Sequence, residues 1–213
     1  MRIRDSGTVC SQPCGRIFGM RKIAKAALLP FLALLVSLSA SAVLSGEDTK
    51  WMRTPDVVYV GTPYDIVSKM LQMAKVKKGD RVYDLGCGDA RMLVLAAQKY
   101  DCRGKGYDID PERVRASREN VARNNVGDLV KIFQADIFTI DLSKADVIPI
   151  YLLPEMNRKL LPQLEKLKPG SRIVCHDYDL EGIIPDETLS MVSNEDNASH
   201  TLSLYTTPLK RRE

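Results

Sequence analysis

The spacing of apolar residues changes repeatedly along the chain from residue 63 onward. A helical spacing predicts a helix over about 63–75 and is made by Ile66, Val67, Met70, Leu71 and Ala74. Short apolar runs bounded by turn residues predict strands at about 81–85, 104–109, 129–135, 146–152 and 172–176. Helical patterns lie between these runs, at about 90–100, from 110 onward and at 154–167. Strands that alternate with helices are typical of a parallel sheet covered by helices.

The tail of the chain adds two further apolar runs, at about 189–192 and 201–206. In the second run, Leu202 and Leu204 alternate with polar or half-polar residues, which is a strand pattern. We expect the two runs to pair as an antiparallel hairpin. The predicted fold is therefore α/β, a doubly wound and mostly parallel seven-stranded sheet with an antiparallel edge hairpin.

Two of the predicted helices have clear start signals. Thr62 stands before Pro63 and three residues ahead of Asp65, so we expect Thr62 to cap the first helix. Asp110 is expected to cap the helix that begins with Pro111 at its first position.

The first 45 residues differ in character from the rest of the chain. Residues 20–42 combine a basic start, an apolar centre and a small-residue ending, which is the order of a secretory signal peptide cleaved after Ala42. The apolar run 26–44 is also long enough to remain as a membrane anchor, and a wrongly extended or otherwise non-exported start is a third interpretation. Met20 stands where a signal peptide would naturally begin, so it competes with Met1 as the true start. We expect a leader at 1–45, a linker at 46–62 that leads into the domain, and a domain at 63–213. On this interpretation the protein is exported or membrane-anchored.

The positive charge of the chain is concentrated in the leader. The net charge is +4, but six of the 31 basic residues and one of the 27 acidic residues lie in the first 42 positions, which leaves 25 basic and 26 acidic residues. A nucleic-acid-binding domain normally carries a clustered basic surface. We therefore expect no specific nucleic-acid partner.

The cysteines and histidines show no spacing typical of a metal site. Cys87, Cys102 and Cys175 form no CxxC pair and each falls beside a predicted strand, where a small buried side chain is the simplest interpretation. The chain has only two histidines, His176 and His200, far apart in sequence. We expect no metal site.

The segment 82–91, VYDLGCGDAR, places a glycine-rich turn after the first strand. Gly86 and Gly88 let the backbone turn and leave room for a ligand, and the next helix offers free N–H groups. A dinucleotide fingerprint would need a small residue at position 91, where Arg91 stands. Asp84 suits a ligand with an ammonium group better than a pyrophosphate. The loop therefore favours S-adenosylmethionine over NAD.

Further acidic residues follow the next two strands. Asp108 ends the second strand, 22 residues after Gly86, and can accept hydrogen bonds from both ribose hydroxyls. Asp136 follows the third strand and can accept the adenine amine while the Ile137 N–H meets a ring nitrogen. Since the carboxyl ends of parallel strands share one edge of the sheet, these residues are expected to form one pocket with the glycine loop.

The motifs DLGCGDAR, GYDIDPERV and QADIF resemble those of class I S-adenosylmethionine-dependent methyltransferases. Residues 59–63 and 151–154, with the GDAR ending, more narrowly resemble the ATP synthase c-subunit lysine methyltransferase family and its bacterial relatives. Ala90 and Gly61 depart from that pattern, which usually has glycine and proline there. The resemblance implies a Rossmann-like methyltransferase fold, S-adenosylmethionine as cofactor, and Asp89 and Thr62 as further cofactor-binding residues.

Three residues are candidates for work at the methyl group. Tyr151 follows the fourth strand and Tyr59 precedes the first helix, and either ring can border a cationic methyl group or orient an amine. His176, with Asp177 beside it, can accept a proton. Each also has a purely structural interpretation, as an aromatic that fills an interface or as a polar loop packed over the pocket.

The resemblance implies methyl transfer to a protein lysine amine. A small-molecule methyltransferase and a non-catalytic S-adenosylmethionine-binding module remain as alternatives. The expected partner is a protein with an accessible lysine, including one associated with a membrane, or a small molecule. The stretch after the fourth strand, 151–154, lacks the Asn or Asp before paired prolines that goes with nucleobase methylation, which disfavours DNA. Because the cofactor is made in the cytoplasm, the side of the membrane stays open.

Overall fold

The computed structural model describes residues 54–212, so the predicted leader and the first part of the linker lie outside the described residues. The helices are α1 (Tyr64–Met73), α2 (Arg91–Tyr100), α3 (Pro111–Arg123) and α4 (Pro154–Leu164). The strands are β1 (Arg81–Leu85), β2 (Arg103–Asp108), β3 (Val130–Gln134), β4 (Val147–Ile150), β5 (Arg172–His176), β6 (Glu187–Val192) and β7 (Ser199–Thr206). All the predicted strands and helices are present, with ends shifted by up to a few residues.

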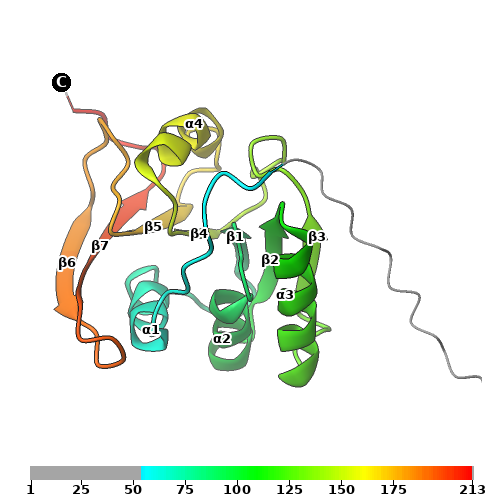
Figure 1. The fold of residues 1–213 in the computed structure, drawn as a ribbon. Helices are drawn as coiled ribbons and strands as arrows, with labels where there is room; N and C mark the ends of the chain where they lie inside the picture. The colour runs from blue at the N-terminus through cyan, green and yellow to red at the C-terminus, as the bar shows by residue number, and fades with distance from the viewer. Residues whose placement is uncertain (1–53, 213) are drawn as a thin grey trace, which may run out of the picture. The chain divides into compact units, whose positions relative to one another are not determined.

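The strands form one seven-stranded sheet in the order β3-β2-β1-β4-β5-β7-β6 (Figure 1). The first five strands pair in parallel, whereas β7 pairs antiparallel with both β5 and β6. The predicted edge hairpin is therefore confirmed. The chain builds outward from β1 to β3 and then returns to place β4 on the other side of β1. Ligands of open α/β sheets bind at such a reversal, beyond the carboxyl ends of the strands.

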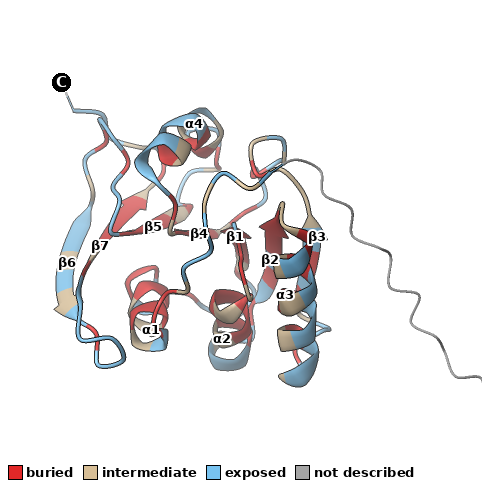
Figure 2. Ribbon diagram, viewed as in Figure 1, coloured by how far each residue is buried: buried red, intermediate tan, exposed pale blue. Residues whose placement is uncertain are grey.

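Helices cover both faces of the sheet. The side chains of α1, α2 and α3 pack with one set of strand residues, including Val82, and those of α4 pack with the other set, including Tyr83 and Leu85. Figure 1 shows α1 to α3 on one side of the sheet and α4 on the other. Successive strand residues point to opposite faces, so a strand covered on both sides is buried along its length, as the central strands are in Figure 2. The doubly wound fold class is confirmed.

The start of α1 differs from the prediction. The helix begins at Tyr64 with Pro63 in the capping position, which offers no side-chain hydrogen bond, and the N–H groups of Asp65 and Ile66 donate to the carboxylates of Glu195 and Asp65. Thr62 instead directs its hydroxyl to Nδ1 of His176, 3.3 Å away. The long-range contact takes the place of the local cap. Asp110, in contrast, caps α3 as predicted and accepts a hydrogen bond from the Glu112 N–H at 2.7 Å.

The prediction of an exported or membrane-anchored protein is corrected. Among residues 54–212, no helix has the length and apolar character needed to cross a membrane. The prediction was drawn from residues 20–44, which lie outside the described part of the chain.

Candidate active site

The glycine loop between β1 and α2 turns through left-handed backbone conformations. Gly86 and Gly88 have φ of 74° and 58°, and the N–H of Gly86 donates to the Tyr107 carbonyl of β2 at 2.8 Å. A Cβ on Gly88 would lie 2.1 Å from a ring carbon of Tyr59. Gly86 is therefore needed for the turn. Gly88 is needed both for the turn and for the close approach of the Tyr59 ring.

Ala90, the departure from the usual glycine, also adopts a left-handed conformation, with φ of 61°. Its side chain is fully buried directly before α2. A residue with a Cβ loses about 1–2 kcal/mol in this conformation. The alanine therefore preserves the shape of the loop with some strain in the backbone.

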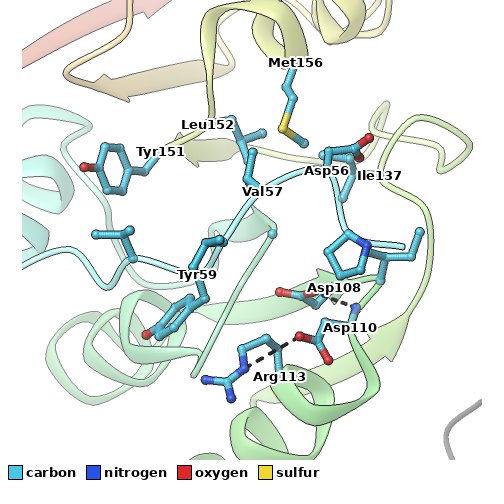
Figure 3. A pocket seen from close by; sticks show the side chains of 15 residues that line it. Asp56, Val57, Tyr59, Asp108, Asp110, Arg113, Ile137, Tyr151, Leu152 and Met156 are labelled. Carbon is cyan, nitrogen blue, oxygen red and sulfur yellow. Dashed lines mark hydrogen bonds and ion pairs between the residues drawn. The ribbon is translucent and has the colours of Figure 1, made fainter. Parts of the chain in front are cut away.

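A cavity lies beyond the carboxyl ends of β1, β2 and β4 (Figure 3). Together with the space open to solvent, it measures about 660 Å³. We call it the main cavity. It is walled by the leading segment, defined here as residues 54–62, and by residues from the strand ends, α3 and α4, namely Gly86, Asp108, Ile109, Asp110, Arg113, Ile137, Tyr151, Leu152 and Met156.

A second cavity adjoins the main one on the side of α2, and we call it the adjoining cavity. Its walls include the predicted cofactor residues Asp84, Gly86, Asp89 and Thr62. Four residues border both cavities, namely Tyr59, Val60, Gly86 and Tyr151. The two hollows therefore meet between a glycine of the loop and two tyrosine rings.

The acidic residues predicted for the cofactor differ in their surroundings. Burial, reinforced by the nearby carboxylates of Asp108 and Asp89, raises the pKa of Asp84 to about 7. Asp108 accepts hydrogen bonds from the N–H groups of Gly88 and Asp110, both at 3.0 Å, while burial raises its pKa. A carboxylate has about four acceptor positions, so these two bonds leave capacity for a ribose diol.

Asp136 and Ile137 take different places. Ile137 borders the main cavity as expected, whereas Asp136 borders neither cavity. An oxygen of the Asp136 carboxylate accepts a hydrogen bond from the Phe138 N–H at 3.0 Å. This bond uses one acceptor position of the carboxylate, and the adenine contact expected from the sequence stays a prediction.

Arg91 connects the glycine loop with the leading segment. Its guanidinium donates to the Asp89 carboxylate at 2.7 Å, to the Thr62 carbonyl at 2.9 Å and to the Tyr59 hydroxyl at 3.1 Å. Although burial opposes it, the hydrogen bonds that Asp89 accepts from Arg91 hold the pKa of its carboxyl below the usual value. A Cβ on Gly61 would lie 2.6 Å from the guanidinium, so a larger residue there would require the Arg91 side chain to shift. Sequence reasoning missed this role because it treated Arg91 only as a misfit in a dinucleotide motif.

The three candidates for catalysis do not lie equally close to the cavities. Tyr59 and Tyr151 border both of them, and burial raises the pKa of Tyr59 to about 12, so its hydroxyl stays protonated. His176 borders neither cavity and lies behind Tyr151, with 4.0 Å between the ring centroids. Its two ring nitrogens face Thr62 and His200.

The residues present fit an S-adenosylmethionine molecule. The main cavity offers the Asp108 carboxylate and the apolar Ile137 to an adenosine group, and the adjoining cavity offers an acid and a guanidinium to the amino-acid end. The positive φ values at the loop leave bare backbone between the two. With the strand order described above, this pocket defines the class I S-adenosylmethionine-dependent methyltransferases.

Comparison with known proteins assigns the chain more narrowly. Residues 84–187 match the ANTKMT methyltransferase domain family. A protein-lysine N-methyltransferase of Saccharolobus islandicus is 40% identical over 153 residues, which cover 71% of this chain and 94% of that protein. The chain therefore belongs to the ANTKMT methyltransferase family.

Two further relatives agree with the class. The ATP synthase c-subunit lysine N-methyltransferase of mouse is 28% identical over 71% of this chain and 61% of that protein. The crystal structure of an RNA methyltransferase from Salinibacter ruber in complex with S-adenosyl-L-homocysteine is 39% identical, with a TM-score of 0.67 over 72% of this chain and 97% of that chain. The cofactor of the family is S-adenosylmethionine.

Proposed function

We propose that this enzyme transfers the methyl group of S-adenosylmethionine to the side-chain amine of a lysine in a protein. The similarity to the Saccharolobus protein-lysine N-methyltransferase, which extends over nearly all of that protein, supports this acceptor. The mouse relative differs in its named target but shares the lysine. The Salinibacter relative is described as an RNA methyltransferase, so RNA is the second candidate acceptor.

The observation that carries the proposal is the position of two tyrosine rings where the cavities meet. If adenosine occupies the main cavity and the amino-acid end occupies the adjoining cavity, the sulfonium lies between them, beside Gly86. Tyr59 and Tyr151 border this junction. Aromatic faces attract cations and exclude water, which suits a methyl group on a positive sulfur and an incoming amine.

Bound S-adenosylmethionine supplies an electrophilic methyl group. The task of the chain is to hold a neutral amine in line with it, because only the unprotonated nitrogen has a lone pair to form the new bond. Desolvation between the rings lowers the pKa of a lysine. The proton of the methylated amine can then leave to water, so Tyr59 and Tyr151 act by positioning and water exclusion without accepting it.

The test of the acceptor uses the full chain, radiolabelled S-adenosylmethionine and three kinds of substrate. These are lysine-containing proteins, the same proteins with acetylated lysines, and RNA. We expect label on unmodified protein alone, with a mass increase of one methyl group located on lysine by mass spectrometry. Label on RNA and none on protein would contradict the proposal, and cofactor binding without transfer to any acceptor would indicate a binding module.

The role of Tyr151 predicts a difference between two substitutions. Tyr151→Ala removes the ring and is expected to lower kcat/KM by about 10- to 100-fold, since a misplaced acceptor costs on the order of 100-fold. Tyr151→Phe keeps the ring and should stay within about threefold of the wild type. Tyr83→Phe is the matched control, because the Tyr83 ring packs in the sheet and borders neither cavity. Unchanged kcat/KM in Tyr151→Ala would contradict the role.

A further inference from the structure

Three metal-binding side chains meet where β5 ends and β7 begins. Nε2 of His176 lies 2.8 Å from Nδ1 of His200 and 3.2 Å from an Asp177 carboxylate oxygen. Nδ1 of His200 lies 3.4 Å from the same oxygen. The two histidines are 24 residues apart in the sequence and come together because β5 and β7 pair in the sheet.

His176 Nε2, His200 Nδ1 and the Asp177 oxygen form a triangle, and its size suits a small divalent ion. Zinc lies about 2.0–2.1 Å from imidazole nitrogen and carboxylate oxygen in tetrahedral sites, so its ligand atoms are about 3.3 Å apart. Two of the three separations are close to this value, and the third would lengthen by about 0.5 Å. Rotation of one imidazole ring is enough for a change of that size.

Counting protons shows that the centre of the triangle is rich in lone pairs. The other nitrogen of His200, Nε2, faces the Asp196 carboxylate at 3.2 Å, and a carboxylate can only accept. The proton of a neutral His200 therefore lies on Nε2, and its Nδ1 turns a lone pair to the triangle. The Asp177 oxygen is also an acceptor. Of the three atoms of the triangle, only Nε2 of His176 can therefore carry a hydrogen.

Neighbouring groups orient each of the three side chains. Thr62 holds His176 through Nδ1, Asp196 holds His200 through Nε2, and the Thr201 N–H donates to the second Asp177 oxygen at 2.9 Å. Hydrogen bonds of this kind to the far side of each ligand are a regular feature of metal sites. Asp177 also has a φ of 60°, an uncommon conformation for a residue with a side chain, which turns its carboxylate back toward the two rings.

We propose that His176 Nε2, His200 Nδ1 and an Asp177 carboxylate oxygen bind one divalent transition-metal ion of the zinc type. Two nitrogens and one carboxylate oxygen suit such an ion better than Mg²⁺ or Ca²⁺, which take mostly oxygen ligands. Three protein ligands leave a fourth tetrahedral position for a water molecule. The spacing of these residues in the sequence had predicted no metal site.

The position of the site connects it with the catalytic pocket. His176 packs against the Tyr151 ring and contacts Thr62, and both of these residues border the adjoining cavity. A bound ion would fix His176 and thereby the back of the Tyr151 ring. The ion itself lies behind the cavity wall, so its binding can be measured independently of methyl transfer.

The experiment titrates the full untagged chain, freed of metal with a chelator, with Zn²⁺ alone and with Co²⁺ alone. We expect one Zn²⁺ per chain by calorimetry and elemental analysis, and for Co²⁺ the intense visible absorption of a four-coordinate site. His200→Gln and Asp177→Asn should each weaken Zn²⁺ binding by more than the 10- to 100-fold typical of losing an outer-shell partner. Asp196→Asn should weaken it within that range. Asn tolerates the left-handed backbone, so Asp177→Asn keeps the fold.

Asp101→Asn is the matched carboxylate control and should bind Zn²⁺ like the wild type, because Asp101 pairs with Lys78 at an exposed position. Circular dichroism and S-adenosylmethionine binding verify that each variant is folded. The proposal is overturned if folded His200→Gln and Asp177→Asn bind Zn²⁺ as tightly as the wild type, or if the wild type binds no stoichiometric ion. Thiolate absorption in the Co²⁺ spectrum would also overturn it, by assigning the ion to cysteines.

Discussion

At the scale of single residues, burial separates carboxylates that look alike in the sequence. Asp84 and Asp89 both belong to the glycine-loop motif and both border the adjoining cavity. Asp89 is bound by Arg91 and stays ionised, whereas Asp84 is buried beside two other acids and has a pKa of about 7. A negative charge on Asp84 therefore costs free energy in the ligand-free protein, and a cationic ligand offsets that cost.

We predict that Asp84→Asn stabilises the ligand-free protein above pH 7. The folded-state pKa of about 7 exceeds the reference value of 3.8, so the folded chain binds more protons than the unfolded chain between these values. The contribution of Asp84 to the free energy of unfolding is therefore present below pH 4 and is lost as the pH rises to 7. The variant should gain up to about 4 kcal/mol at pH 8 and little at pH 4.

Urea unfolding at pH 4, 6 and 8 measures this difference, and calorimetry with S-adenosylmethionine at pH 8 measures the accompanying loss of affinity. A stability difference between Asp84→Asn and the wild type that does not change with pH would contradict the assignment. Asp141→Asn serves as a control, since Asp141 is an exposed carboxylate whose pKa lies below its usual value.

At the scale of elements, the leading segment completes a pocket that the strand ends only begin. Residues 55–60 form one wall of the main cavity, and Figure 3 shows Val57 and Tyr59 of this segment facing the strand ends. Two contacts of the Arg91 guanidinium, with the Thr62 carbonyl and the Tyr59 hydroxyl, hold the segment, while a third anchors the guanidinium to Asp89 of the glycine loop; Thr62 does not cap α1. The wall of the cofactor site that this segment forms therefore depends on the contacts of Arg91.

We predict that Arg91→Ala loosens the leading segment and weakens S-adenosylmethionine binding by about tenfold, because several charge-assisted hydrogen bonds are lost together. Hydrogen exchange of residues 57–62 should become faster. Arg158→Ala is the control, since its pair with Glu181 is largely exposed, and such pairs contribute about 0–1 kcal/mol. Unchanged exchange and affinity in Arg91→Ala would show that the segment is held by its apolar contacts.

At the scale of the whole molecule, the two apolar layers enclose the cysteines of the described residues. Cys87, Cys102 and Cys175 are all buried and free, as the sequence predicted. Burial raises the pKa of Cys102 to about 11 and the pKa of Cys175 even further. The reactive thiolate is therefore scarce at neutral pH.

We predict that iodoacetamide leaves Cys102 and Cys175 unmodified in the native protein and labels both when the protein is unfolded in urea. Peptide mass spectrometry measures the label at each position. The two cysteines should become reactive together, at the urea concentration of global unfolding, because they lie in opposite layers of one sheet. Labelling of either one under native conditions would mean that its layer opens independently.

The site was predictable from the sequence to the extent that it depends on the order of residues around strand ends. Gly86, Asp84, Asp108 and Ile137 border the two cavities and follow from a local turn and from the rule that parallel strands end at one edge. Gly88 belongs to the same turn but borders neither cavity, and it lies against the Tyr59 ring. Asp136 borders neither cavity, and its carboxylate accepts a hydrogen bond from the Phe138 N–H of its own loop, a local contact that leaves no mark in the sequence.

The sequence by itself determined the elements, the covering of both faces of the sheet and the glycine loop, since these depend on the periodicity of apolar residues and on local backbone preference. Only the tertiary structure decided which distant side chains meet. It placed Arg91 against Thr62, set the two tyrosines where the cavities join, and brought His200 to His176. The physical reason is that such contacts depend on strand pairing and side-chain direction over long separations, which no spacing along the chain encodes.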